Sequence, residues 1–315
     1  MNHLSSLLLS LHSSLLAPQD SSYSRQAPTT FDPIPFLLGM KGPASCIRFD
    51  GSKPATLYLV PRDGMKPVEA VQVDPHFNFH FANAYEDASG NIIFDVVKCS
   101  KMTLGDTSTS TRPIWEDIDY GKEVPFSTLS RYTLRRDASM GVWGYTSKDL
   151  SSTQVDFTSV DVRVSCRPHR YVYASCGSDT GTSTPVQGVI CLDTTAGEEQ
   201  AWLGERDEFL GECIFVEKEG SKGEGDGYVL TILTNGKKMS SEFLIFDASN
   251  VAAGPISRQK LPSFVPHGLH GFWANDLVND PDEISRKWKA AISIDNKNWN
   301  EVKSDFSGLG VAYDL

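Results

Sequence analysis

Positive charge is scarce in this sequence, and none occurs near its start. The 315 residues include 29 Lys and Arg against 40 Asp and Glu, which gives a formal net charge of −11. Nucleic-acid binding needs clustered Lys and Arg to neutralise phosphates, so this balance argues against a nucleic-acid partner. It also argues against a large cationic membrane-binding surface, although it is compatible with a small apolar docking patch. No Lys or Arg precedes Arg25, whereas a secretory signal peptide begins with a basic region.

Paired cysteines and long apolar runs are also absent. The six cysteines are scattered and form no C-x-x-C pair. In a chain of this length, that pattern is typical of buried thiols in a reducing compartment rather than of a disulfide framework or a zinc site. We therefore expect an intracellular protein, in the cytoplasm or a plastid. No segment reaches the roughly 20 apolar residues of a membrane-spanning helix, and no H-E-x-x-H motif indicates a metallohydrolase.

The first 30 residues are rich in leucine and serine, and we assign residues 1–30 to a leader. Five leucines recur at the spacing of an amphipathic helix, with serines on the other face. Such a helix could provide a peripheral contact with a membrane. A Ser-rich organelle transit segment and a disordered leader are the alternatives. The leucines are Leu4, Leu7, Leu8, Leu11 and Leu15.

From Phe31 onward, the sequence consists mainly of short strand-like segments separated by turn residues. Each segment is rich in Val, Ile, Tyr, Phe or Thr and is bounded by Gly, Pro, Asn or Asp. Many short strands at this spacing predict an all-β fold, either a sandwich, a barrel or a propeller. Residues 275–315 differ, with a predicted surface helix at Asp282–Ala291 and a polar tail. The predicted strands are Ala55–Pro61, Val68–Val73, Asn78–Ala84, Asn91–Val97, Ser130–Arg135, Arg170–Ser175, Gly188–Asp193, Gly227–Thr234 and Glu242–Asp247.

Two histidines have the sequence context of buried metal ligands. His80 lies among aromatic residues in FNFHFANAYED, and His270 lies in the Pro/Gly-framed segment LPSFVPHGLHGFW, both of which we interpret as strands. An imidazole can be buried neutral and still offer a lone pair to a metal. A buried histidine bonded to a backbone carbonyl is the commoner case, so each context is weak evidence when taken alone.

Strand geometry limits how the neighbouring histidines could contribute. His76 and His80 are four residues apart, so on a strand they share a face but lie roughly 13 Å apart. His267 and His270 are three apart and would point to opposite faces. We therefore expect one ligand from each pair, and we interpret His169 as a structural or loop residue.

Taken together, these contexts resemble the carotenoid cleavage oxygenase family. FHFANAYED is similar to the segment around the third iron-ligating histidine of that family, and VPHGLHGFW to the segment around its fourth. Between them, VDFTSVDVRVSCRPHRYVYA resembles the acidic-Phe-Pro segment and the R-Y-x-Y strand that follows it. GECIFVEKEGSKGEGDGYVLTIL resembles the G-E-P-x-F-V block. The motifs occur in the right order from about Phe31 to Trp273.

The resemblance implies a site. It makes His80 and His270 ligands of a catalytic Fe(II), with Asp156 and Glu212 as the carboxylates behind them. A carboxylate that accepts a hydrogen bond from the outer imidazole nitrogen fixes the orientation and tautomer of the ring. Asp156 stands where the family normally has Glu and is one methylene shorter. Either the strand shifts inward, or a water bridges the gap, or the contact is lost.

The resemblance also implies a seven-bladed β-propeller with the iron on its axis. Phe31–Trp273 covers 243 positions, enough for about five blades at about 40–50 residues each. We therefore expect residues 31–274 to form an incomplete propeller and residues 275–315 to be an appended tail. The first two ligand segments of the family have no counterpart, since no remaining histidine has their context. The chain is then either a truncated gene model or fragment of an enzyme, or a decayed relative.

Two functions follow from the resemblance. The first is O2-dependent cleavage of a carbon–carbon double bond in an apolar polyene, such as a carotenoid or apocarotenoid, or in a stilbene-like molecule, which gives two carbonyl products. Iron would be the only cofactor. The alternative is a non-catalytic β-propeller binding module. No Ser–His–Asp or Cys–His nucleophile set supports a hydrolase instead.

Overall fold

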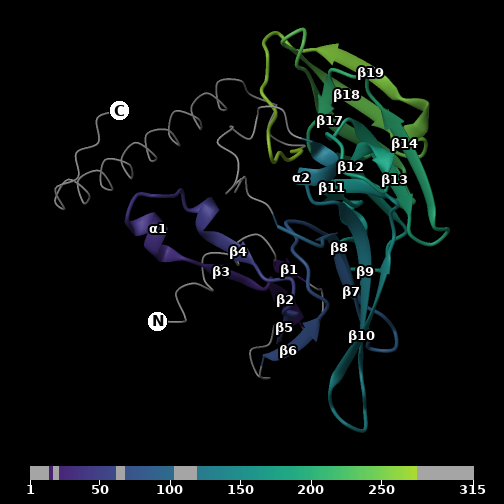
Figure 1. Ribbon diagram of the computed structural model, residues 1–315. Helices are drawn as coiled ribbons and strands as arrows, with labels where there is room; N and C mark the ends of the chain where they lie inside the picture. Colours follow the sequence, from purple (N-terminus) through teal and green to yellow (C-terminus); the bar gives the residue numbers. More distant parts are fainter. Residues whose placement is uncertain (1–13, 17–20, 62–67, 103–118, 275–315) are drawn as a thin grey trace, which may run out of the picture. The chain divides into compact units, whose positions relative to one another are not determined.

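The computed structural model describes residues 14–16, 21–61, 68–102 and 119–274, shown as coloured ribbon in Figure 1. Residues up to Gly271 form one compact unit, and Phe272 begins a second one. His3, His12 and the helix predicted at Asp282–Ala291 lie outside the described residues.

The regular secondary structure of the described chain is almost all β, as predicted. Its strands form antiparallel sheets, and the first contains β1 (Ser14–Leu16), β2 (Ser21–Gln26), β5 (Ala55–Pro61) and β6 (Glu69–Val73). The second contains β7 (Phe81–Glu86), β8 (Ile92–Cys99), β9 (Ser127–Arg136) and β10 (Trp143–Asp149). The third contains β11 (Thr153–Ser159), β12 (Tyr171–Thr180), β13 (Gly188–Asp193) and β14 (Glu198–Leu203).

The fourth sheet and a ribbon complete the β-structure. The fourth sheet contains β15 (Glu208–Leu210), β16 (Ile214–Glu217), β17 (Gly227–Asn235), β18 (Ser240–Asp247) and β19 (Pro255–Lys260). β3 (Thr29–Phe31) and β4 (Ile47–Phe49) form the separate ribbon. The helical segments are α1 (Pro33–Leu37), α2 (Tyr120–Glu123), η1 (Ala44–Cys46), η2 (Val162–Val164) and η3 (Val251–Ala253).

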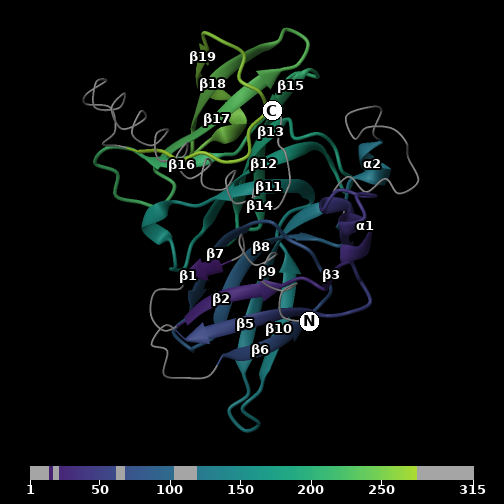
Figure 2. The same cartoon turned by 90° about the vertical axis from the view of Figure 1, so that its left-hand side faces the viewer.

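Successive sheets bury their faces against one another. Side chains alternate along a strand, so Val172 and Ala174 of β12 enter the core shared with the second sheet, while Tyr173 enters the core shared with the fourth. A third core lies between the first and second sheets and includes Leu57 and Phe94. Three four-stranded antiparallel sheets and one five-stranded sheet follow one another in sequence order (Figures 1 and 2), as the blades of a β-propeller do. The part of the chain that the structure describes contains four such sheets and the ribbon, where the sequence indicated about five blades.

The structure differs from the strand prediction mainly at sheet edges. β10 and β14 were not predicted, and neither has a buried face: their residues are almost all exposed. Such strands lack the apolar alternation on which the prediction depends. β2 also lies within the segment assigned to a leader, because its polar sequence SSYSRQ gives no apolar signal, yet it pairs with β5 over its whole length.

Candidate metal centre

His80 and His270 are 190 positions apart in the sequence, and the fold brings their rings together. Their Nε2 atoms lie 3.4 Å apart, and the ring planes are nearly perpendicular at 82°. Neither residue lies in a strand, contrary to the prediction. His80 directly precedes β7, where its carbonyl accepts a hydrogen bond from Val97 of β8, and His270 lies in the extended segment after β19. The opposite-face argument for His267 and His270 was therefore wrong.

Each ring is bonded to a carboxylate through its other nitrogen. Nδ1 of His80 lies 2.6 Å from Oδ1 of Asp156, and Nδ1 of His270 lies 3.1 Å from Oε1 of Glu212. Backbone N–H groups hold both carboxylates, since Phe157 donates to Asp156 at 2.9 Å and Gly271 donates to Glu212 at 2.7 Å. Ionised carboxylates can only accept hydrogen bonds, so both rings carry their proton on Nδ1.

The shorter Asp156 reaches His80 directly because the backbone around it is irregular. The register of β11 against β12 shifts between Asp156 and Ser159. Phe157 has a φ of +51°, a left-handed conformation that is uncommon for residues other than glycine. Of the three outcomes left open by the sequence, the structure shows the direct contact.

The two Nε2 atoms have the chemistry of metal ligands. With the protons on Nδ1, each Nε2 presents a lone pair to the other, and two lone pairs cannot form a hydrogen bond. A cation satisfies both, because metal–imidazole bonds of about 2.1 Å let one ion touch two nitrogens up to about 4.2 Å apart. The residues present therefore fit a metal ion. No group of three or more His, Cys, Asp or Glu side chains suited to a metal is found among the described residues.

The remaining described histidines do not join this pair. His76 is fully buried, with Nδ1 bonded to the carbonyl of Asp74 at 2.8 Å. His169 is also buried and bonds Asp95 at 2.8 Å, in agreement with its interpretation as a structural residue. His267 is exposed.

Aromatic rings surround the pair on part of its surface. The ring of Phe157 lies 5.1 Å from that of His80 and 5.8 Å from that of His270. Phe79 lies 6.3 Å from His80 and is partly exposed. The histidine side chains themselves are 22% and 45% exposed. The site therefore combines open imidazoles with apolar walls, which suits an apolar ligand.

Sequence reasoning missed Ser175, which lies opposite Asp156 on the neighbouring strand and bonds the residue next to Glu212. Ser175 is fully buried on β12, and its Oγ donates to the carbonyl of Gly211, the neighbour of Glu212. The only sequence signal for this role is a polar residue inside the apolar run YVYASC.

Four of the cysteines, Cys46, Cys176, Cys191 and Cys213, are buried free thiols. Burial raises the pKa of Cys191 and that of Cys213 to about 12. These two thiols therefore stay protonated at neutral pH.

Comparison with known proteins shows what this chain is related to. The family model described as retinal pigment epithelial membrane protein matches residues 24–275. Apocarotenoid-15,15'-oxygenase of Synechocystis sp. is 32% identical over 247 residues, which cover 78% of this chain and 48% of that protein. Lignostilbene-alpha,beta-dioxygenase isozyme III of Sphingomonas paucimobilis is 26% identical over 243 residues, which cover 72% of this chain and 48% of that protein.

Solved structures agree with the sequence relatives. The crystal structure of cobalt-substituted Synechocystis apocarotenoid oxygenase superposes with a TM-score of 0.76 at 28% identity, covering 84% of this chain and 52% of that one. The chain thus spans about half the length of the relatives it matches, and the four sheets of its described residues form part of a seven-bladed β-propeller. With the ordered sheets and the paired histidines, these matches show that the chain belongs to the retinal pigment epithelial membrane protein family, that of the carotenoid cleavage oxygenases.

Proposed function

We propose that this chain carries part of the non-haem Fe(II) centre of an oxygenase. The reaction is O2-dependent cleavage of a carbon–carbon double bond in a carotenoid, apocarotenoid or stilbene-like substrate, with two carbonyl products. The observation that carries the proposal is the 3.4 Å separation of the His80 and His270 Nε2 atoms, each ring being backed by a carboxylate. The names of its relatives, which include an apocarotenoid oxygenase and a lignostilbene dioxygenase, support the substrate class.

The protein groups would hold and orient the metal ligands. Asp156 and Glu212 keep the protons on Nδ1, so that both rings coordinate as neutral donors through Nε2. Neutral ligands leave the metal its full positive charge. Bound Fe(II) would supply the activation of O2. Phe157 provides an apolar surface beside both rings, which favours an apolar substrate.

One observation favours a second candidate, a non-catalytic β-propeller binding module. In the described ranges only two imidazoles converge, and no larger group of metal ligands is present. Metal affinity depends on the number and preorganisation of ligands. A module of this kind would fold and remain soluble without iron.

Metal analysis distinguishes the two candidates. We expect the purified 315-residue chain to bind Fe(II) at one equivalent, and His80→Ala or His270→Ala to abolish that binding. His267→Ala is the matched control, because His267 is exposed and lies in the same segment as His270. Incubation with O2 and either an apocarotenal or a hydroxystilbene should then give two carbonyl products with the iron-loaded protein and none with the iron-free protein. A folded wild-type chain that binds no iron would support the binding module.

We further propose that the protein is intracellular, in the cytoplasm or a plastid, and contacts a membrane peripherally through α1. Free thiols are typical of reducing compartments. No helix among the described residues is long and apolar enough to cross a bilayer. A short helix instead presents apolar side chains to solvent, with exposures of 64% for Ile34, 77% for Leu37 and 72% for Met40 just beyond its end. Burying these side chains in lipid would bring the protein to an apolar substrate.

A further inference from the structure

The strand that directly follows His80 and the strand that carries Asp156 are both irregular close to these residues. In β7, the register against β8 shifts between Phe81 and Asn83. In β11, the register against β12 shifts between Asp156 and Ser159. A bulge interrupts the hydrogen-bond ladder and bends its strand. Backbone pairing alone therefore does not fix the distance between His80 and Asp156.

A buried asparagine fastens these two regions to each other. Asn83, only 1% exposed, lies three residues after His80. Its Nδ2 donates to the carbonyls of Val164 and Arg167, each at 3.0 Å, and its Oδ1 accepts from the N–H of Cys166 at 2.8 Å. These three partners belong to the connection between β11 and β12. One side chain thus ties β7 to the segment that follows β11.

The connection needs this support because of its own conformation. Cys166 has a φ of +62°, in the left-handed region that non-glycine residues rarely adopt. Such a conformation persists where surrounding contacts over-determine it. The hydrogen bond from Cys166 to Asn83 is one of those contacts.

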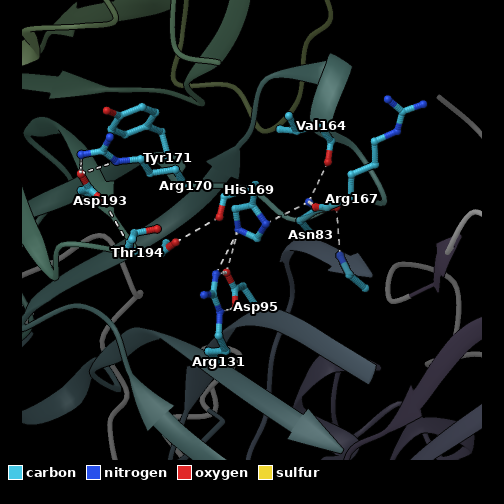
Figure 3. Close-up of polar contacts among 12 residues, drawn as sticks. Asn83, Asp95, Arg131, Val164, Arg167, His169, Arg170, Tyr171, Asp193 and Thr194 are labelled. Carbon is cyan, nitrogen blue, oxygen red and sulfur yellow. Dashed lines mark hydrogen bonds and ion pairs between the residues drawn. The ribbon is translucent and has the colours of Figure 1, made fainter. Parts of the chain in front are cut away.

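His169 orients the Asn83 amide. Its Nε2 lies 2.8 Å from Oδ2 of Asp95, and its Nδ1 lies 3.1 Å from Nδ2 of Asn83 (Figure 3). An ionised Asp95 accepts the Nε2 proton, so Nδ1 is the acceptor and Asn83 must present its NH2 group. Asn83, His169, Asp95 and Arg131, which we call the buried polar cluster, therefore have one consistent hydrogen-bond arrangement.

Charged hydrogen bonds to Asp95 hold this cluster in one geometry. Asp95 is fully buried and accepts two hydrogen bonds from Arg131, both at 2.7 Å. Burial alone would raise the pKa of Asp95, but Arg131 and His169 outweigh it and hold the pKa below its usual range. Loss of either partner would leave a buried charge unpaired and would strongly destabilise the folded protein. Two-point arginine–carboxylate pairs also restrict geometry.

We propose that Asn83, oriented by His169, Asp95 and Arg131, is a positioning residue for the His80–Asp156 pair. The cluster touches neither ring of the candidate metal centre. It sets the separation between β7 and β11, and through it the 2.6 Å contact that orients His80. The inference rests on the proposed function insofar as this orientation serves a metal.

Asn83→Asp tests the proposal in the full chain. The variant keeps the acceptor for Cys166 but removes the donors to Val164, Arg167 and His169. Two measurements report on His80: the ¹⁵N resonance of its Nδ1 in the metal-free protein and the affinity for Co(II), followed by absorption. We expect a displaced or broadened resonance and at least about a tenfold loss of affinity, the range for losing support around a metal ligand.

Glu208→Gln is the matched control, since Glu208 is a buried carboxylate on β15, outside the buried polar cluster, that forms an ion pair with Arg258 at 2.9 Å. We expect it to lower the melting temperature and leave both His80 measurements unchanged. A folded Asn83→Asp protein with wild-type resonance and affinity would overturn the proposal. If Asn83→Asp does not fold, Arg131→Lys replaces it, because this variant keeps the positive charge but loses the two-point contact with Asp95. We expect the same change in the His80 resonance and the same loss of Co(II) affinity. A wild-type chain that binds no Co(II) would count against the proposed function but not against the positioning role of Asn83. The ¹⁵N resonance of His80 in the metal-free protein still tests that role.

Discussion

Ser175 lies directly opposite Asp156 across β11 and β12, and its hydroxyl donates to the carbonyl of Gly211 at 2.5 Å. Gly211 immediately precedes Glu212. One buried serine therefore lies opposite Asp156 in the strand register and bonds the residue next to Glu212 through its side chain. A displacement of β12 would move both carboxylates, and with them both imidazoles.

We expect Ser175→Ala to weaken metal binding more than its effect on stability would indicate. The carbonyl of Gly211 keeps a second donor, Thr231, at 3.2 Å, so the free energy of unfolding should fall by only about 1 kcal/mol. Urea unfolding and Co(II) titration measure the two effects. Ser130→Ala, which also removes a fully buried hydroxyl, is the control, and equal Co(II) affinities in the two variants would contradict the prediction.

Asp156→Asn should retain the fold and lose metal affinity. The amide oxygen can still accept from the backbone N–H of Phe157, but the negative charge that holds the proton on Nδ1 of His80 is gone. Loss of such a partner typically reduces metal affinity about 10- to 100-fold. Asp149→Asn, at a carboxylate that is 55% exposed, controls for removal of a charge. Wild-type Co(II) affinity in Asp156→Asn would show that the carboxylate has no role in metal binding.

Stability should depend on pH through Asp95. Its pKa is lowered on folding, so its contribution is fully present above the unfolded-state value of about 3.9 and is lost as the pH falls through the lower folded value. Asp95→Asn should cost about 3 kcal/mol at pH 7, and its difference from wild type should shrink below about pH 4. Urea unfolding at a series of pH values measures this. Asp137→Asn, in an exposed turn, should show little change, and an Asp95→Asn difference that is constant down to pH 2 would refute the assignment.

The α1 segment should determine binding to lipid. The helix is held by Asp32, whose side chain accepts from the N–H of Ile34, and by Gly39, which has a φ of +66° beyond its end. We expect Leu37→Asp with Met40→Asp to reduce sedimentation with neutral phosphatidylcholine vesicles severalfold at unchanged melting temperature. Met140→Asp is the control, because Met140 is similarly exposed at 70% in the turn between β9 and β10. Equal binding by the two variants would exclude α1 as the contact.

Strand prediction succeeded best for strands that lie inside a sheet and bury apolar residues, whereas β11, β15 and β16 were missed although each has buried residues. β5 and β13 have the predicted bounds, since Leu57 and Leu59 alternate with less buried residues and every residue of β13 is buried. Outer strands such as β14, with the sequence EEQAWL, escaped prediction because hydrogen bonding to a neighbour, and not burial, makes them strands.

The candidate site also contains residues that the sequence was sufficient to select and residues whose roles only the fold decided. The resemblance to the family was sufficient to select His80, His270, Asp156 and Glu212 as candidates, because each lies in a short segment similar to a motif of that family. The reach of the shorter Asp156 depends on a register shift and a positive φ, neither of which leaves a mark in the residue types. The roles of Asn83 and Ser175 were likewise invisible. A hydrogen bond to a backbone carbonyl more than 30 positions away requires no particular residue at that position, so only the folded chain decides which carbonyls they meet.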